Sequence, residues 1–375
     1  MQINPVSVIR NGLSSFLGLP ETAEVSLFSA PSHPLFATER ANLILQRTEI
    51  LALIFAVLVP LWILIDARIF PGDTVNRLAI ARSIVAFAFA LLLLFTMAAR
   101  NRRASIWTAR IALLFLLIIP ALFEIYVQTL FSSLNHTVQI ASLQQAAISL
   151  YRQLPIVYVI GIALFPLSLI ESVPLVIIMI ALSTVADMGG TTLAPFQAAN
   201  WSDIWMVAVV GIVSSLAALL QLNLLWNDYY LRYFDVETGL LKRESGMNLL
   251  HLLWGRAETR RGNIGVAMLS IPPAPMQGGN KRITAASRWA DRFRQLQRKK
   301  LFSLYGVRWE RDICGFITYN YTHESTINIM MKLEPETSSS ANIEGNSAAA
   351  SRVEDHCDNP VELVLYTESR LKQPR

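Results

Sequence analysis

Long apolar runs between Ile50 and Trp226 constrain this chain more than any other feature. Six such segments can be placed, at 50–65, 80–99, 106–130, 155–170, 173–188 and 204–226. A helix needs about 20 mostly apolar residues to cross a bilayer, where only helices and closed barrels satisfy their own backbone groups. The pattern therefore predicts a multi-span α-helical membrane domain over residues 49–226.

The fourth and fifth segments are short, and only Glu171 and Ser172 separate them. They could form a tight helical hairpin, or a single broken or re-entrant element. Counting them as two spans gives six in all.

The composition changes after the last apolar segment. The whole chain is 53% hydrophobic and 16% charged, whereas soluble domains carry about 25% charged residues. The deficit lies in the apolar region, and charge gathers towards the C-terminus. We expect a short linker helix at 227–234, which would couple the last span to a soluble domain of residues 235–375.

Two function classes find no support. The two cysteines, Cys314 and Cys357, allow no disulfide framework and have no metal-ligand spacing. The net charge of +5 is modest and does not by itself indicate nucleic acid. We therefore expect no metal site and no nucleic-acid partner.

The orientation of the spans follows from the arginines. Arg100, Arg102 and Arg103 lie between the second and third segments, whereas 189–203 has no Lys or Arg. Because Lys and Arg are enriched on the cytoplasmic side, both termini should be cytoplasmic. Residues 1–48, interrupted by several prolines, would form a flexible cytoplasmic arm, and we expect no cleaved signal peptide.

Some charged side chains fall in or at the ends of the spans. They are Asp66, Arg82, Glu124 and Asp187. Charge in a membrane is costly and marks a candidate functional site, here a polar pocket that senses an external ligand or ion. The alternative is that these charges lie at the interface and reach water, with one structural pair between Arg82 and Glu124.

The C-terminal part alternates helix and strand patterns. Apolar spacings predict helices at 245–259 and 283–296, and a buried strand at 262–271. Two strand-like runs within 305–319 flank a charged tip and predict a hairpin. Residues 326–332 look like a strand, 336–359 is a disordered loop by composition, and 364–369 could be helix or strand.

Two motifs in this part resemble those of GGDEF domains, the diguanylate cyclase family. The first, the opening motif (235–243), matches the family run D-x-L-T-G-L-x-N-R at Asp235, Thr238, Gly239, Leu240 and Arg243. The second, the signature segment (308–314), resembles R-x-G-G-[DE]-E-F and retains Arg308 and Asp312. The helix–strand–helix–hairpin order between the motifs also matches, as does their spacing.

The resemblance implies a small α/β, nucleotide-cyclase-like cytoplasmic domain that usually dimerises. In the family this domain makes cyclic di-GMP from GTP with Mg²⁺, and it often follows a sensor module in the bacterial inner membrane. We expect one helix of the family fold to be missing here, because only a few residues separate Tyr321 from 326–332.

The departures from the family pattern concern the catalytic groups. Glu310 and Arg311 replace the two glycines of the signature, and Ile313 and Cys314 replace its Glu and Phe. Ser270 and Pro272 fall where the family has a metal-binding D-x-D stretch, so the hard oxygen ligands are missing. Phosphoryl transfer depends on positioning and charge stabilisation. We therefore expect no catalytic residues, no metal and no cofactor.

These observations predict an inner-membrane signalling protein with a degenerate GGDEF domain, acting through contacts with an unidentified protein partner and forming a homodimer. One alternative is an active diguanylate cyclase that uses GTP and Mg²⁺. Another is a membrane transport or assembly subunit, for which the proline-rich stretch around Pro166 is the place to look for broken spans.

Overall fold

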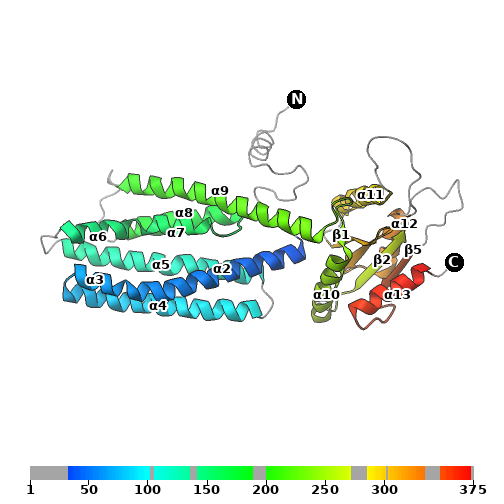
Figure 1. Ribbon diagram of the computed structural model, residues 1–375, viewed down its shortest axis with the longest axis horizontal. Coiled ribbons are helices and arrows are strands. Elements are labelled where there is room, and N and C mark those ends of the chain that lie inside the picture. Colours follow the sequence, from blue (N-terminus) through cyan, green and yellow to red (C-terminus); the bar gives the residue numbers. More distant parts are fainter. Residues whose placement is uncertain are drawn as a thin grey trace, which may run out of the picture. The chain divides into compact units, whose positions relative to one another are not determined.

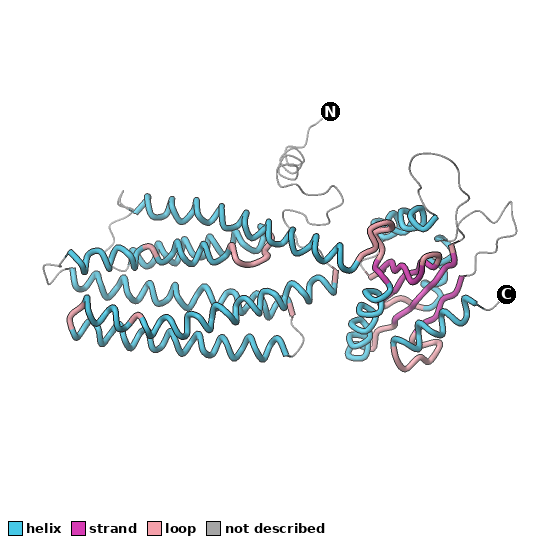
Figure 2. The backbone as a smooth tube through the Cα atoms, in the orientation of Figure 1, coloured by secondary structure: helices cyan, strands magenta, loops and turns pink. Residues whose placement is uncertain are grey.

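The computed structural model describes residues 33–101, 105–135, 142–188, 200–271, 285–300, 303–333 and 347–372. The chain divides into two compact units, Met1–Asn227 and Asp228–Arg375. The first is helical and the second contains a sheet (Figures 1 and 2). Each unit is described by itself.

The first unit is a bundle of helices that run alongside one another (Figure 1). α2 contains Pro60 and ends one residue later. α3 follows after a break at Trp62. The helices are α2 (Pro34–Leu61), α3 (Ile63–Ile69), α4 (Gly72–Asn101), α5 (Ile106–Asn135), α6 (Ser142–Arg152), α7 (Leu154–Ile162), α8 (Leu169–Met188) and α9 (Asn200–Tyr233).

Four helical stretches among the described residues are long and apolar enough to cross a membrane. They are Pro34–Ile69, Gly72–Asn101, Ile106–Phe131 and Ile204–Tyr233. The apolar helix Leu169–Val185 is shorter. The expected fourth span, 155–170, is interrupted because the chain leaves the helical conformation at 163–168, around Pro166. The structure therefore supports four spans by length and composition, and the count of six is not confirmed.

The distribution of side chains in this unit is that of a membrane-embedded protein. Large apolar side chains such as Leu64, Ile84 and Phe87 are exposed. Charged side chains lie inside, including those of Arg40, Asp66, Arg82 and Glu124. Such an arrangement would be unfavourable in water, whereas a bilayer solvates the apolar surface and leaves charges to pair within the bundle.

The N-terminal arm is shorter than the sequence suggested. α2 begins at Pro34, and Phe36 and Ile44 are fully buried in the bundle. Pro34 begins this helix because a proline in the first turn lacks only an N–H that would have no partner there. Residues 34–48 are therefore helical, and residues 1–32 lie outside the described part of the chain.

The linker helix expected at 227–234 is the end of α9. α9 continues without interruption to Tyr233, and Phe234 N still donates to Tyr230 O at 2.9 Å. Near this end Trp226 packs edge-on against Phe36, with the ring centroids 5.0 Å apart. A continuous helix thus leads from the last candidate span to the second unit.

The second unit is a five-stranded sheet with helices on both faces (Figure 1). The strand order is β1-β3-β4-β2-β5, parallel between β1 and β3 and antiparallel elsewhere. α11 and α12 cover one face, and α10 and α13 cover the other. The elements are β1 (Leu241–Lys242), α10 (Arg243–Arg260), β2 (Ile264–Ser270), α11 (Ala285–Lys300), β3 (Leu304–Glu310), β4 (Ile313–Tyr319), α12 (His323–Leu333), β5 (Ser347–Ser351) and α13 (Pro360–Lys372).

The expected helices, strand and hairpin of this unit form as α10, β2, α11 and β3–β4, but the stretch after the hairpin differs. Residues 326–332 lie in α12 and not in a strand, so a helix does follow the hairpin. Thr322 caps this helix, since its Oγ1 accepts from Ser325 N at 3.2 Å. Ile329, Met330 and Leu333 form its buried face, at helical spacing.

The expected loop at 336–359 contains β5, whose residues are all buried. Its serines and alanines are small, which lets α12 and α13 approach the strand from both faces. The stretch 364–369, left open between helix and strand, is helical and lies in α13.

Candidate functional site

The opening motif folds into a tight turn around one carboxylate. Asp235 Oδ2 accepts from Thr238 N at 3.0 Å and from Thr238 Oγ1 at 2.7 Å. Gly239 adopts a positive φ of 65° and donates to Asp235 O at 2.7 Å. A residue with a Cβ rarely adopts that conformation, which explains the glycine. Leu240 is buried and leads into β1.

Arg308 of the signature segment joins the hairpin to this turn. Its Nη1 donates to Asp235 Oδ2 at 2.7 Å and to Glu237 Oε2 at 2.8 Å. The parallel pairing of β1 with β3 places Lys242 opposite Arg308 and so brings the two segments together. Sequence reasoning missed the role of Glu237, which replaces a family leucine and supplies the second carboxylate.

The hairpin carries a β-bulge at Trp309. Arg308 pairs with Cys314 and Glu310 with Ile313, so Trp309 has no partner on β4. Trp309 is buried, and Gly315 leaves room beside it: a Cβ on Gly315 would lie 2.9 Å from Trp309 Nε1 and 2.2 Å from Ala267 O. A bulge bends its strand and redirects the neighbouring side chains.

The end of β2 lies against the hairpin tip. Ser270 pairs with Ile313, and Ile271 N donates to Asp312 O at 2.7 Å. Asp312 and Arg311 are exposed at the tip, while Pro272 lies outside the described residues. The fold thus brings together the opening motif, the end of β2 and the signature segment.

The position of the first signature glycine is filled by a side chain that forms an ion pair. Glu310 Oε1 accepts from Arg243 Nη1 at 3.5 Å, and Arg243 Nη2 donates to Glu368 Oε1 of α13 at 3.0 Å. A retained motif residue, Arg243, therefore bridges the hairpin and α13. Glu368 was missed because it lies 125 residues from Arg243 along the chain and meets it only in the folded unit.

Burial and hydrogen bonds shift the pKa values of two ionisable groups here. Burial works to raise the pKa of Asp235, but the hydrogen bonds from Thr238 and Arg308 outweigh it and hold the pKa below its usual value. Burial raises the pKa of the Cys314 thiol to about 12, so this side chain is a neutral core group. Within the described ranges no three or more His, Cys, Asp or Glu side chains could hold a metal ion.

The charged residues of the membrane unit form a different pair from the one expected. Arg82 Nε donates to Asp66 Oδ2 at 2.6 Å, where the sequence had suggested Glu124. Tyr151 donates to Asp66 Oδ1 at 2.8 Å and also contacts the Arg82 guanidinium. The Arg82 guanidinium lies 5.3 Å from the Phe123 ring centroid. These contacts link α3, α4, α5 and α6.

The other two candidate sensor residues lie on α5 and α8. Glu124 is buried in α5. Asp187 lies in the last turn of α8, and its side chain is outside the described part of the structure.

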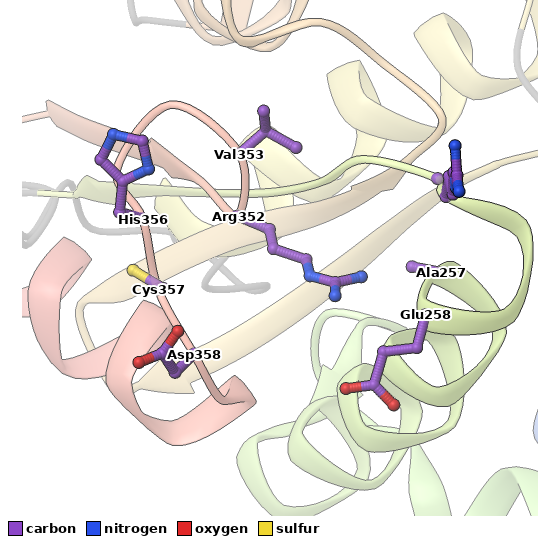
Figure 3. Close-up of a pocket in the computed structure, with 9 residues that line it drawn as sticks. Ala257, Glu258, Arg352, Val353, His356, Cys357 and Asp358 are labelled. Carbon is purple, nitrogen blue, oxygen red and sulfur yellow. The ribbon is translucent and has the colours of Figure 1, made fainter.

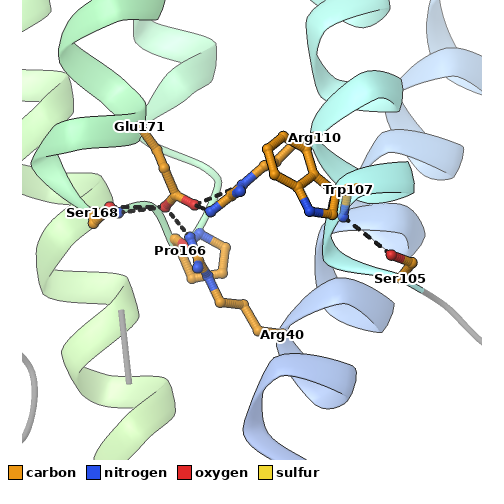
Figure 4. Close-up of polar contacts among 7 residues, drawn as sticks. All are labelled: Arg40, Ser105, Trp107, Arg110, Pro166, Ser168 and Glu171. Atoms are coloured by element: carbon orange, nitrogen blue, oxygen red, sulfur yellow. Dashed lines mark hydrogen bonds and ion pairs between the residues drawn. The ribbon is translucent and has the colours of Figure 1, made fainter. Parts of the chain in front are cut away.

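A second polar cluster was missed by the sequence analysis (Figure 4). Glu171 pairs with Arg40 and accepts from Arg110 Nε at 2.9 Å. It also accepts from Ser168 N and Ser168 Oγ, both at 3.0 Å. Arg40 Nε donates to Pro166 O at 2.8 Å, which satisfies a carbonyl of the non-helical stretch. The one sign in the sequence was Glu171 itself, a charged residue between two apolar segments.

A separate cleft of ≈ 450 Å³ lies at the other end of β2 (Figure 3). Arg352 extends between Glu258 of α10 and Asp358 of the loop before α13, with its guanidinium 4.8 Å from the Trp254 ring centroid. The cleft contains none of the motif positions. β2 begins near it and ends at the signature segment, so the two are separate sites.

Comparisons with known proteins give limited guidance. No family model matches the chain, and no curated protein matches it. One similar solved structure is the GGDEF domain of DgcB from Caulobacter crescentus in complex with c-di-GMP. It has 14% sequence identity and a TM-score of 0.30, and the match covers 37% of this chain and 85% of that one. A likeness this weak carries no argument, so the functional interpretation rests on the motifs and their geometry.

Proposed function

We propose that this protein is an inner-membrane signalling protein whose C-terminal unit is a catalytically inactive GGDEF-like output domain. It acts in or beside cyclic di-GMP signalling through contacts with a protein partner. The helical unit serves as the sensor, and α9 transmits its state to the opening motif.

One observation carries the proposal. The motif positions converge in space, yet the position of the first signature glycine holds Glu310, whose carboxylate pairs with Arg243. A glycine there would let a nucleotide approach the backbone, whereas a charged side chain occupies that space. The neighbouring position at the end of β2 is Ser270, which offers a hydroxyl where a divalent metal on a triphosphate needs a carboxylate.

The retained residues support a structural role for the motif. Asp235, Thr238 and Gly239 make the turn, and Arg308 fastens the hairpin to it. These contacts maintain the fold without any nucleotide. A domain that keeps the scaffold and loses the phosphate and metal groups is suited to binding another protein.

The proposal is tested by calorimetric titration of the full-length protein in detergent with GTP–Mg²⁺ and with cyclic di-GMP. We expect no saturable binding of either nucleotide. An active cyclase of the family, titrated in the same detergent, is the positive control. Saturable binding of either nucleotide would replace the protein-contact role with that of a nucleotide receptor.

The proposed topology has six crossings and both termini in the cytoplasm. The six apolar segments give the number of crossings, and the orientation follows from the arginines near Arg100 and from the lack of Lys and Arg in 189–203. Single cysteines at Gly72 and Ser105 test the orientation, because both sites are exposed, Gly72 at the start of α4 and Ser105 directly before α5. An impermeant thiol reagent should label intact cells at position 72 only, and labelling at position 105 would contradict the topology.

We also propose a homodimer, as is usual for domains of this kind. Light scattering of the detergent-solubilised protein, corrected for bound detergent, gives the protein mass directly. A monomer at every concentration tested would rule the dimer out.

A further inference from the structure

α11 is an amphipathic helix whose apolar side is fixed to the sheet. Trp289 and Phe293 are buried and stack with their ring centroids 5.4 Å apart. Phe293 also lies 6.1 Å from Phe316 of β4. The opposite side of α11 therefore faces away from the core.

That opposite side is strongly basic. Arg288 and Arg292 are exposed, and Arg294 forms an ion pair with Asp291 at 2.9 Å. α11 carries six basic residues and one acidic residue. The unit Asp228–Arg375 as a whole has 21 basic and 17 acidic residues, so the rest of this unit is close to neutral. The excess positive charge is concentrated on one helix.

α11 also lies beside the segment through which the chain leaves the membrane. Arg294 Nη2 donates to Thr238 O at 3.3 Å. A Cβ on Gly239 would lie 3.0 Å from the Tyr230 hydroxyl and 3.8 Å from Arg294 Nη1. Tyr230 belongs to α9, roughly one turn after Trp226, a residue type that favours the membrane interface. α11 thus packs against a segment that begins only a few residues after Trp226 along the chain.

We propose that the exposed face of α11 binds the anionic phospholipid headgroups of the membrane in which this protein is embedded. Each basic residue near such a surface contributes about 1 kcal/mol of attraction. The attraction falls off within a Debye length of about 8–10 Å at physiological salt, so it favours a basic face that the chain itself attaches to the membrane. Nucleic acid shares the negative charge but is not held nearby by the chain.

The test uses the full-length protein in nanodiscs with a fluorophore on Gln295→Cys, an exposed position of α11. The native cysteines are buried, and protein without the added cysteine gives the background. Lipids with a headgroup quencher report contact. Nanodiscs contain either phosphatidylcholine alone or phosphatidylcholine with phosphatidylglycerol. We expect stronger quenching in the anionic discs, and its loss in high salt.

The double variant Arg288→Gln/Arg292→Gln should lower the contact equilibrium in anionic discs by roughly 25-fold, about fivefold per arginine. The matched control is Arg256→Gln/Arg260→Gln, which removes two exposed arginines from α10 on the other face of the sheet. This control should quench like the unmodified protein, and circular dichroism checks that both variants are folded.

Three outcomes would overturn the proposal. The first is equal quenching in zwitterionic and anionic discs. The second is quenching that the α11 substitutions do not change. The third is tight binding of duplex DNA to the protein in zwitterionic discs, lost in the α11 variant, without preference for anionic lipid. That third result would assign the basic face to nucleic acid.

Discussion

The guanidinium of Arg308 binds the carboxylate of Asp235 at a distance of 2.7 Å. Both side chains are mostly buried, with exposures of 16% and 25%. The pair connects two segments that lie far apart in the sequence and that the family resemblance had identified independently. Its role in the structure is to hold the hairpin against the turn of the opening motif.

Asp235→Ala should destabilise the sheet unit by about 1–3 kcal/mol, because Arg308 and Thr238 lose a charged acceptor. Hydrogen exchange of the full-length protein in detergent measures this as faster opening of β1 and β3. Asp228→Ala is the matched control: its pair with Arg232 is exposed, and such pairs contribute about 0–1 kcal/mol. Equal effects of the two variants would show that the Asp235 turn does not support the sheet.

The same carboxylate gives the unit a defined acid sensitivity. The folded pKa of Asp235 is below its ordinary value of 3.8, so its charge stabilises the folded state above that pH. This stability is lost as the pH falls through the lower folded pKa. The difference in opening free energy between the protein and its Asp235→Asn variant should therefore shrink below pH 3.8. A constant difference down to pH 2 would refute the assignment.

Much of the sheet unit could be predicted from local pattern. Apolar periodicity placed α10, β2, α11 and the hairpin, since each buries one regular face. α12 was taken for a strand because the Ile-rich run 326–332 has high β-propensity, while the cap at Thr322 and the buried spacing decide for helix. β5 was missed because its side chains are all Ser and Ala, which are small and have no strong preference for strands.

In the membrane unit, the sequence predicted the apolar segments but not the contacts among their charged side chains. Hydropathy located the apolar segments, but it could not choose the partner of Arg82, because both Asp66 and Glu124 were available at a similar depth. It also could not find the Glu171 cluster, whose members come from α2, α5 and α8 and meet only in the folded bundle.

Arg82→Ala should destabilise the helical unit by about 3–5 kcal/mol, because it leaves Asp66 buried without a counter-charge. The double variant Asp66→Leu/Arg82→Met removes both charges and should recover most of that loss. Thermal unfolding of the protein in detergent gives the comparison. If the double variant is no more stable than Arg82→Ala, the Asp66–Arg82 pair is not the coupled unit described.

Gly211 allows α9 to approach α8. A Cβ at this position would lie 2.4 Å from Val176 Cγ1. Gly211→Ala should lower the midpoint of thermal unfolding, since overpacking costs about 1–3 kcal/mol. Val176→Ala in the same chain should restore part of the loss by making room for the added methyl. Purely additive destabilisation by the two changes would contradict the close packing of these helices.

The most direct test of an inactive output domain is turnover. Full-length protein in nanodiscs is incubated with GTP and Mg²⁺, and the products are separated by chromatography, with an active diguanylate cyclase as positive control. The protein should yield no cyclic di-GMP above a blank without protein, because Ser270 and Glu310 occupy the positions of a metal carboxylate and a signature glycine. Steady formation of cyclic di-GMP, abolished by a change at Asp312, would show that the site is active.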